Sequence, residues 1–233
     1  GLLERLNGVA AESHGAAWLR LMYAYPSCFT DEMVDAIADL PHVVKYIDMP
    51  IQHINDTVLQ RMRRRTSRKL IEALLEKLRR RTNDIAIRTT LIAGFPGETE
   101  AQHAELVAFV REFGFEAMGV FAYSPEPGTP AGAMHHAGEA VPQSVVEARI
   151  DDLMRAQQQI VFARHRQLAK DRAECDVLID ASPSDTDPRC VGRTSHQAPQ
   201  IDGVCVVENA ERLVPGELVK CRVIDSDGYD LVV

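Results

Sequence analysis

The order of hydrophobic and polar residues changes period several times along the first 171 residues. Continuous apolar runs, which are typical of buried strands, alternate with segments in which apolar residues recur every three or four positions, as on one face of a helix. The runs cover residues 16–26, 43–52, 84–95 and 117–124, and the helical segments cover residues 30–40, 55–64, 67–81, 99–114 and about 143–171. Thr30 and Thr99 are placed as N-caps, and Gln102 completes a capping box with Thr99.

Strands that alternate with helices through short connections favour a parallel sheet with right-handed crossovers, either open or closed into a barrel. Both architectures bind ligands at the carboxyl ends of the strands. Unusual sequences stand at three of these ends, namely MPIQH, AGFPGE and YSPEPGTP. We therefore expect a ligand site where these three strand exits meet.

The last sixty residues have a different pattern. Short alternating stretches, such as residues 173–181 and 216–233, are separated by Gly, Pro and Asp turns, which predicts a small all-β barrel or OB-like module. The long helix before them would act as a linker. We expect two domains, residues 1–168 and residues 169–233.

The turn in LIAGFPGETE (Leu91–Glu100) is the main candidate for ligand contact. It matches neither G-x-x-x-x-G-K-[ST] nor G-x-G-x-x-G, and Glu98 stands where a phosphate loop needs a cation. Two interpretations stay open from the residues alone. Pro96 and Gly97 can form a purely structural turn, or the glycines admit an uncharged or cationic ligand and Glu98 accepts a hydrogen bond from it.

Charge is distributed unevenly over the 233 residues. Residues 171–233 carry thirteen Asp and Glu against six Lys and Arg, so this stretch holds −7 of the formal net charge of −8. A module this acidic repels nucleic acid and attracts a basic partner. The run RMRRRTSRK (Arg61–Lys69) is basic instead, and we interpret it as a solvated helix face, with an RNA contact as the alternative.

The remaining features of the composition exclude several classes of protein. No apolar run reaches the roughly 18 residues of a membrane span, and the N-terminus has neither a secretory signal nor an initiator Met. We expect a cytoplasmic protein or an internal fragment of one. The five cysteines include no C-x-x-C pair, which indicates neither a disulfide framework nor a metal site.

Three segments resemble, in their order and spacing, the radical S-adenosylmethionine methylthiotransferases: MPIQHINDTVLQRMRRR, IRTTLIAGFPGETE and GVFAYSPEPGTPAG. DGVCVVE and GELVKCRVIDSDGYDLVV are similar to the C-terminal TRAM domain of that family. The resemblance implies an α/β fold, a partial parallel (β/α) barrel of the radical SAM type, followed by a small all-β TRAM barrel. YIDMPIQH is closer to the branch that modifies ribosomal protein S-twelve than to the transfer-RNA branch, which typically reads PVQSGS. The acidic tail agrees with a basic protein substrate.

The resemblance also implies cofactors, S-adenosylmethionine and two 4Fe–4S clusters. The cluster motif C-x-x-x-C-x-x-C and the three further cysteines of the second cluster are absent from this sequence, and Cys28 alone cannot replace three thiolates. We expect the missing strands and ligands upstream of Gly1 in the parent protein, and an inactive fragment without them. The parent would attach a methylthio group to the β-carbon of an aspartate in S-twelve. The alternatives are a transfer-RNA methylthiotransferase and a non-catalytic fragment that binds ribosomal protein or RNA.

By the same resemblance, a set of residues at the strand exits would contact S-adenosylmethionine. The turn against the adenosine comprises Gly94, Phe95, Pro96, Gly97 and Glu98. Gln52 would bond the ribose or the carboxylate.

Two further residues have a functional and a structural interpretation. Arg88 would pair with the methionine carboxylate, or else form an internal ion pair. Tyr123 would contact adenine or substrate, or else cap the strand as an ordinary aromatic residue. For His53 we expect a structural role. The acidic TRAM domain would bind S-twelve, and RMRRRTSRK is the candidate for ribosomal RNA contact.

Overall fold

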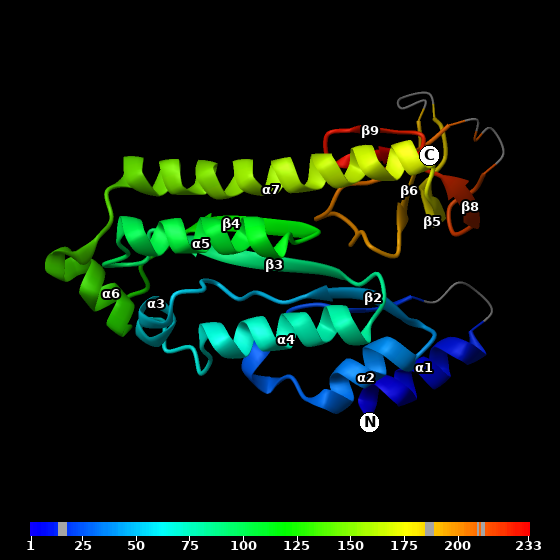
Figure 1. Cartoon of the computed structure of the whole chain (residues 1–233). Helices are drawn as coiled ribbons and strands as arrows, with labels where there is room; N and C mark the ends of the chain where they lie inside the picture. The colour runs from blue at the N-terminus through cyan, green and yellow to red at the C-terminus, as the bar shows by residue number, and fades with distance from the viewer. Residues whose placement is uncertain (14–17, 185–188, 209, 211–212) are drawn as a thin grey trace.

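The computed structural model describes residues 1–13, 18–184, 189–208, 210 and 213–233. A parallel sheet with its helices and a separate β module are joined by the long helix α7 (Gln143–Asp171), which extends along the molecule from α6 (Pro130–Met134) to the β module (Figure 1). The helix predicted from about residue 143 to residue 171 is therefore confirmed.

The first sheet contains four parallel strands in the order β1-β2-β3-β4. The strands are β1 (Leu19–Leu21), β2 (Val43–Asp48), β3 (Ala86–Ala93) and β4 (Ala117–Ala122). Strand–helix alternation predicted this arrangement, and the partial α/β barrel is confirmed. The run predicted as a strand over residues 16–26 forms only three strand residues, and residues 16 and 17 lie outside the described part of the chain.

The helices between the strands begin at side-chain caps. The oxygen of Thr30 accepts from Met33 N at α2 (Asp31–Asp39), and Asn55 caps α3 (Asp56–Arg61). The predicted capping box of Thr99 and Gln102 opens α5 (Glu100–Phe113). The other helical elements are α1 (Leu2–Glu12), the short 3₁₀ helix of Pro26–Cys28, α4 (Arg68–Arg81) and a π-helical turn at His135–Glu139. The sequence pattern did not predict α1.

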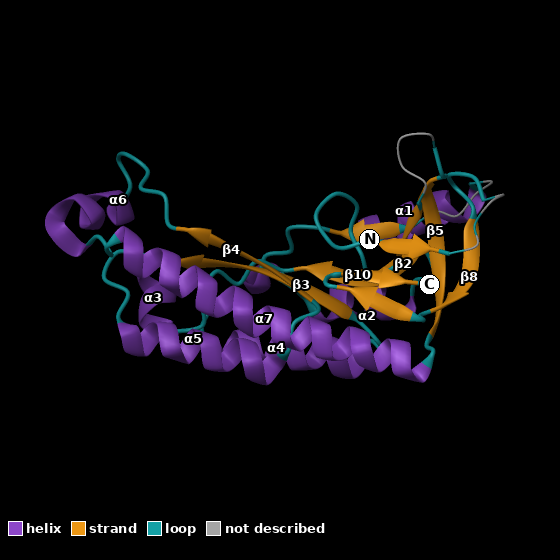
Figure 2. Ribbon diagram, turned by 90° about the horizontal axis from the view of Figure 1, so that it is seen from above, coloured by secondary structure: helices purple, strands orange, loops and turns teal. Residues whose placement is uncertain are grey.

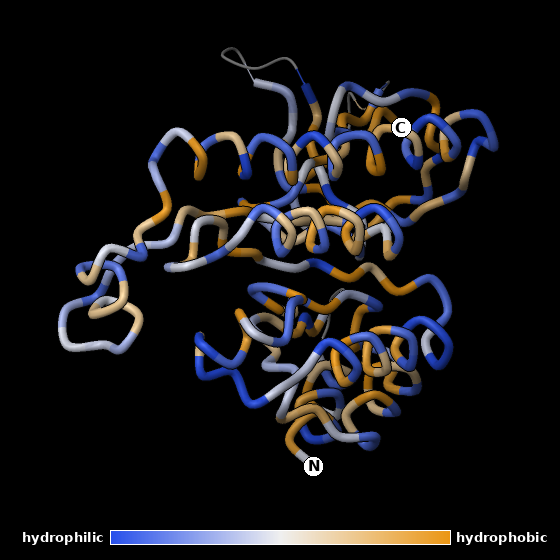
Figure 3. The backbone as a smooth tube through the Cα atoms, turned by 60° about the vertical axis from the view of Figure 1, so that its left-hand side comes forward, coloured by the Kyte–Doolittle hydropathy of each residue, from blue (hydrophilic) through white to orange (hydrophobic). Residues whose placement is uncertain are grey.

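Helices α2, α3, α4, α5 and α7 cover one face of the parallel sheet and bury its main core. Ile47 and Ile87 of the strands pack with Leu75, Leu106 and Leu153 of the helices, all fully buried. Each such side chain stabilises the fold by about 1.5–3 kcal/mol relative to exposure. Figure 2 shows α4, α5 and α7 on one side of β3 and β4, and in Figure 3 hydrophobic stretches lie both on extended segments and on helical coils.

The β module contains six strands in the order β8-β5-β6-β7-β10-β9. They are β5 (Glu174–Ala181), β6 (Cys190–Thr194), β7 (Cys205–Val207), β8 (Leu218–Arg222), β9 (Asp225–Asp227) and β10 (Asp230–Val232). Their core includes Val177, Ile179, Cys205 and Val223. Burial raises the pKa of the Cys205 thiol to about 12, so this cysteine behaves as a small core residue.

The β module docks on the face of the parallel sheet that the helices leave uncovered. Tyr46 of β2 donates from its hydroxyl to Asp202 Oδ2 at 2.7 Å, and Ala198 N donates to the same oxygen at 2.8 Å. Arg88 Nε lies 3.5 Å from Asp202 Oδ1. The β module also contacts α7, where the ring centroids of Phe162 (α7) and Tyr229 are 5.3 Å apart.

Among the described helices, none is long and apolar enough to span a membrane.

Candidate functional site

The three strand exits with unusual sequences meet at one edge of the parallel sheet. Tyr123 N donates to Ala93 O at 2.9 Å, and Gln52 pairs with Leu91 in an isolated parallel bridge. The rings of Phe95 and Tyr123 meet edge to face with centroids 5.3 Å apart. The structure therefore brings together the residues after β2, β3 and β4, as the parallel arrangement predicts.

Gln52 holds a strained backbone at this edge. Its φ is +68°, and His53 N donates to Ile51 O at 2.9 Å, which closes a three-residue turn around Gln52. Such a turn with positive φ is rare for a residue other than glycine and costs on the order of 1–3 kcal/mol. Its side-chain amide has no hydrogen-bond partner among the described residues and is free for a ligand. Strain at a sheet edge with an unused amide is typical of a binding position.

The turn after β3 depends on its two glycines. Gly94 and Gly97 have φ values of +77° and +73°, which favour glycine. A Cβ on Gly94 would lie 2.4 Å from Cγ2 of Val146, a residue of α7 that packs directly on the turn. Glu98 N donates to Phe95 O at 2.9 Å and closes the turn.

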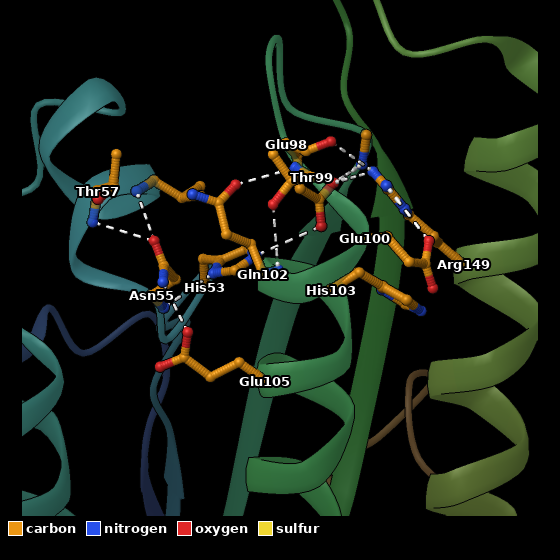
Figure 4. Close-up of polar contacts among 12 residues, drawn as sticks. His53, Asn55, Thr57, Glu98, Thr99, Glu100, Gln102, His103, Glu105 and Arg149 are labelled. Carbon is orange, nitrogen blue, oxygen red and sulfur yellow. Dashed lines mark hydrogen bonds and ion pairs between the residues drawn. The ribbon is translucent and has the colours of Figure 1, made fainter.

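Glu98 is fixed by three internal donors instead of facing solvent. Its side chain is fully buried, and it accepts from Gly94 N at 2.5 Å, Arg149 Nη1 at 3.1 Å and His53 Nε2 at 3.4 Å (Figure 4). Burial raises the pKa of the Glu98 carboxyl, but the hydrogen bond from His53, the charge of Arg149 and the hydrogen bond from Gly94 outweigh burial and hold the pKa below its ordinary value. The carboxylate thus shapes the turn, and the ligand would meet the backbone of the turn.

The neighbours of His53 define its tautomer. Asn55 N donates to His53 Nδ1 at 3.0 Å, so Nε2 carries the proton that faces Glu98. Asn55 Nδ2 in turn donates to Glu105 Oε2 at 2.6 Å. These contacts link the exit of β2 to the helix after β3 (Figure 4), and they fit the structural role expected for His53.

Arg88 lies apart from this edge. It precedes Ala93 by five residues, or about 16 Å along a strand, and its Nη1 lies 2.8 Å from Asp48 Oδ1. Together with His165 and His196 it lines a cavity of about 740 Å³ between the parallel sheet, α7 and the β module. The structure does not place its guanidinium with Gln52, the glycine turn and Tyr123.

The residues present fit the two kinds of cofactor differently. Within the described ranges no group of three or more Cys, His, Asp or Glu is arranged to hold a metal ion, and the described cysteines are free and scattered. The described residues therefore do not offer a cluster site. The glycine turn, the unpaired Gln52 amide and the Phe95–Tyr123 pair fit a nucleoside, which needs close backbone approach, a hydrogen bond and an aromatic contact.

The sequence did not single out two structurally important residues. Arg149 is a buried cation in α7, and its position on the same helix face as Val146 and Leu153 is the pattern that would have revealed it. Asp202 lies in a loop of the β module, and nothing in the local pattern indicated that it contacts the parallel sheet.

Comparison with protein families assigns both parts of the chain. Residues 4–110 match the radical SAM superfamily, and residues 173–233 match the TRAM domain. The first match includes β1, β2, β3 and the glycine turn. The second contains the whole β module.

Curated relatives match almost the whole chain. The protein named "Ribosomal protein uS12 methylthiotransferase RimO" of Geobacter sulfurreducens is 43% identical over 99% of this chain and 50% of its own length. The protein of the same name from Anaeromyxobacter sp. (strain Fw109-5) is 44% identical over 94% of this chain and 45% of its own length. The chain thus spans about half the length of the curated relatives it matches.

A solved structure supports the fold. Coproporphyrinogen III oxidase (HemN) from Escherichia coli, described as a radical SAM enzyme, aligns with a TM-score of 0.55 and 14% identity over 83% of this chain and 49% of that chain. At this identity the likeness concerns the fold alone. The two domain matches and the relatives named RimO show that the chain is a RimO-like member of the radical SAM methylthiotransferase family.

Proposed function

We propose that this chain is the part of a radical SAM methylthiotransferase that holds the nucleoside of S-adenosylmethionine and recognises a ribosomal protein. Its relatives are named for ribosomal protein uS12, and the parent would add a methylthio group to the β-carbon of an aspartate of that protein, in the cytoplasm. S-adenosylmethionine and two 4Fe–4S clusters would supply the radical and sulfur chemistry in the parent. The convergence of Gln52, the glycine turn and Tyr123 at one sheet edge carries the cofactor part of this proposal.

The residues of this chain would orient the cofactor and keep its site dry. Phe95 is buried, and Glu98, His53 and Arg149 hold the turn so that its backbone is fixed before a ligand binds. A site held in this way loses little entropy on binding. Arg88 as partner of the methionine carboxylate remains part of the proposal, and it would have to exchange Asp48 for that carboxylate.

The acidic TRAM domain would bind the basic ribosomal protein. Its charge suits such a substrate and disfavours transfer RNA, although Asp185, Asp187 and Glu211 lie outside the described residues. The test measures the binding of purified S-twelve and of transfer RNA to this chain over a salt series. Tighter, salt-sensitive binding of S-twelve supports the proposal, and tighter binding of transfer RNA refutes it.

A charge variant locates the contact within the chain. Glu208→Gln with Asp227→Asn removes two exposed carboxylates of the TRAM domain and should weaken S-twelve binding by about threefold per charge. Glu76→Gln with Glu112→Gln removes two exposed carboxylates from α4 and α5 and serves as the matched control. Equal weakening by both pairs would contradict a contact at the TRAM domain.

A further inference from the structure

Three consecutive arginines, Arg63, Arg64 and Arg65, follow α3. The chain has a second such triplet at 79–81, but two of its members pair with carboxylates. Arg63 and Arg65 are exposed and have no carboxylate partner among the described residues. The flanking Arg61 and Arg68 differ, since each lies within 3.6 Å of a glutamate oxygen. The three arginines are therefore not part of the ion-pair network that neutralises their neighbours.

Arg63 occupies a backbone position that favours glycine. Its φ is +55°, its N donates to Gln60 O at 2.9 Å, and Arg64 N donates to Leu59 O at 2.9 Å. These two bonds are those of a Schellman motif, in which the residue with positive φ is usually glycine. Stability alone favours glycine here, so the charge of Arg63 can be removed by Arg63→Gly without straining the turn.

The arginines border an open hollow of about 630 Å³ at the N-terminal end of α4. Its other lining residues are Asp56, Gln60, Thr66 and Ser67. Asp56 is already engaged, because its Oδ1 accepts from Arg68 N at 2.6 Å. The hollow therefore presents guanidinium groups over an exposed surface, which fits an extended polyanion better than a small enclosed ion.

One aromatic side chain adjoins the arginines. The guanidinium of Arg64 lies over the ring of Tyr25, 4.7 Å from its centroid. The Tyr25 side chain itself is half-buried. Cationic side chains beside an aromatic ring are used to bind single-stranded nucleic acid, because phosphates meet the cations and a base can stack on the ring or on the guanidinium plane above it.

We propose that Arg63, Arg64 and Arg65, with Tyr25, form a binding surface for the phosphate backbone of single-stranded RNA. Guanidinium groups bind phosphate oxygens in a bidentate manner. The basic ribosomal protein is repelled here and attracted by the acidic TRAM domain, so the two surfaces separate two ligand classes. The inference rests on the proposed function, in which the substrate is a ribosomal protein and thus adjoins RNA. Its test uses no ribosomal protein, so its failure can be told apart from a failure of the proposed function.

The test measures fluorescence anisotropy of a labelled oligouridylate of about twelve nucleotides with the 233-residue chain, at several NaCl concentrations from about 50 to about 300 mM. Arg63→Glu with Arg65→Glu should weaken binding by at least about tenfold and reduce the salt slope by about 1.4, as expected for two lost phosphate contacts on a single strand. The control, Arg5→Glu with Arg80→Glu, changes the net charge equally at exposed sites on α1 and α4 and should have a much smaller effect.

A second variant separates binding from folding. Arg63→Gly keeps the turn and relieves its strain, so its melting temperature should rise or stay equal while its RNA affinity falls. The proposal is overturned if the chain does not bind the RNA, if both charge-reversal pairs weaken binding equally, or if Arg63→Gly binds like the wild type. Competition by polyglutamate as strong as by RNA at equal charge would also overturn it, in favour of an acidic protein partner.

Discussion

Arg149 of α7 and Glu98 of the glycine turn form a buried ion pair, with Arg149 Nη1 at 3.1 Å from Glu98 Oε2 and with side chains 6% and 0% exposed. The same Nη1 donates to the backbone oxygen of Glu98 at 3.1 Å. Because α7 also contacts the TRAM domain through Phe162, one rigid helix fixes the turn at one end and the domain at the other.

Arg149→Ala should strongly destabilise the fold. The substitution leaves the buried carboxylate of Glu98 without its cation, and breaking a buried pair in this way costs about 3–5 kcal/mol. Urea denaturation measures the change. Arg155→Ala on the same helix is the control, since Arg155 is 67% exposed and forms a surface ion pair with Asp152, and it should change stability by less than about 1 kcal/mol. Equal effects would contradict the role assigned to Arg149.

The Glu98 carboxylate should make stability depend on acid pH. Its pKa in the folded state lies below its ordinary value of 4.5, so its stabilising contribution is complete above pH 4.5 and is lost as pH falls through the lower folded value. Glu98→Gln should be less stable than wild type at neutral pH, and the difference should shrink toward acid. A constant difference at every pH would show that the charge of Glu98 does not contribute.

Two histidines in the cavity between the domains should cause a second loss of stability, at a higher pH than the loss caused by Glu98. Burial is the main cause that lowers the pKa of both His165 and His196 below 6.5. Their contribution is therefore complete above pH 6.5 and is lost as pH falls below it. Thermal unfolding between pH 7.5 and pH 5.5, a window set by that ordinary value, should be less pH-dependent in the variant with His165→Gln and His196→Gln. His136→Gln, at an exposed position, should retain the wild-type dependence.

Gly94→Ala should disturb the turn for two separable reasons. The positive φ costs an alanine about 1–2 kcal/mol, and the added Cβ would lie 2.4 Å from Val146 Cγ2, which adds about 1–3 kcal/mol of overpacking. When Val146→Ala is combined with Gly94→Ala, the stability lost through overpacking should be recovered, and the stability lost through the positive φ should not. Denaturant unfolding of the single and double variants gives the coupling, and strictly additive effects would contradict the contact.

The sequence predicted the elements of the fold well because their causes are local. Apolar runs mark β2 and β3, and the capping box at Thr99 marks the start of α5. The order of strands along the sheet then places their exits at one edge. The edge formed by Gln52, the glycine turn and Tyr123 thus followed from periodicity and topology.

Long-range contacts were not predictable in the same way. The roles of Arg149 and Asp202 depend on residues 51 and 156 positions away, namely Glu98 and Tyr46. The pattern placed Arg88 on a strand, but it did not show that β2 supplies Asp48 as its partner. The strain at Gln52 and Arg63 was also not predictable, because neither residue type favours a positive φ.

The most direct test of the cofactor site is amide NMR of the isotopically labelled chain titrated with S-adenosylmethionine. We predict chemical-shift changes at Gln52, Gly94, Gly97 and Tyr123, and weaker changes in Gly94→Ala. Changes confined to the cavity lined by Arg88, His165 and His196, or no changes at millimolar ligand, would contradict the assignment of the strand exits as the nucleoside site.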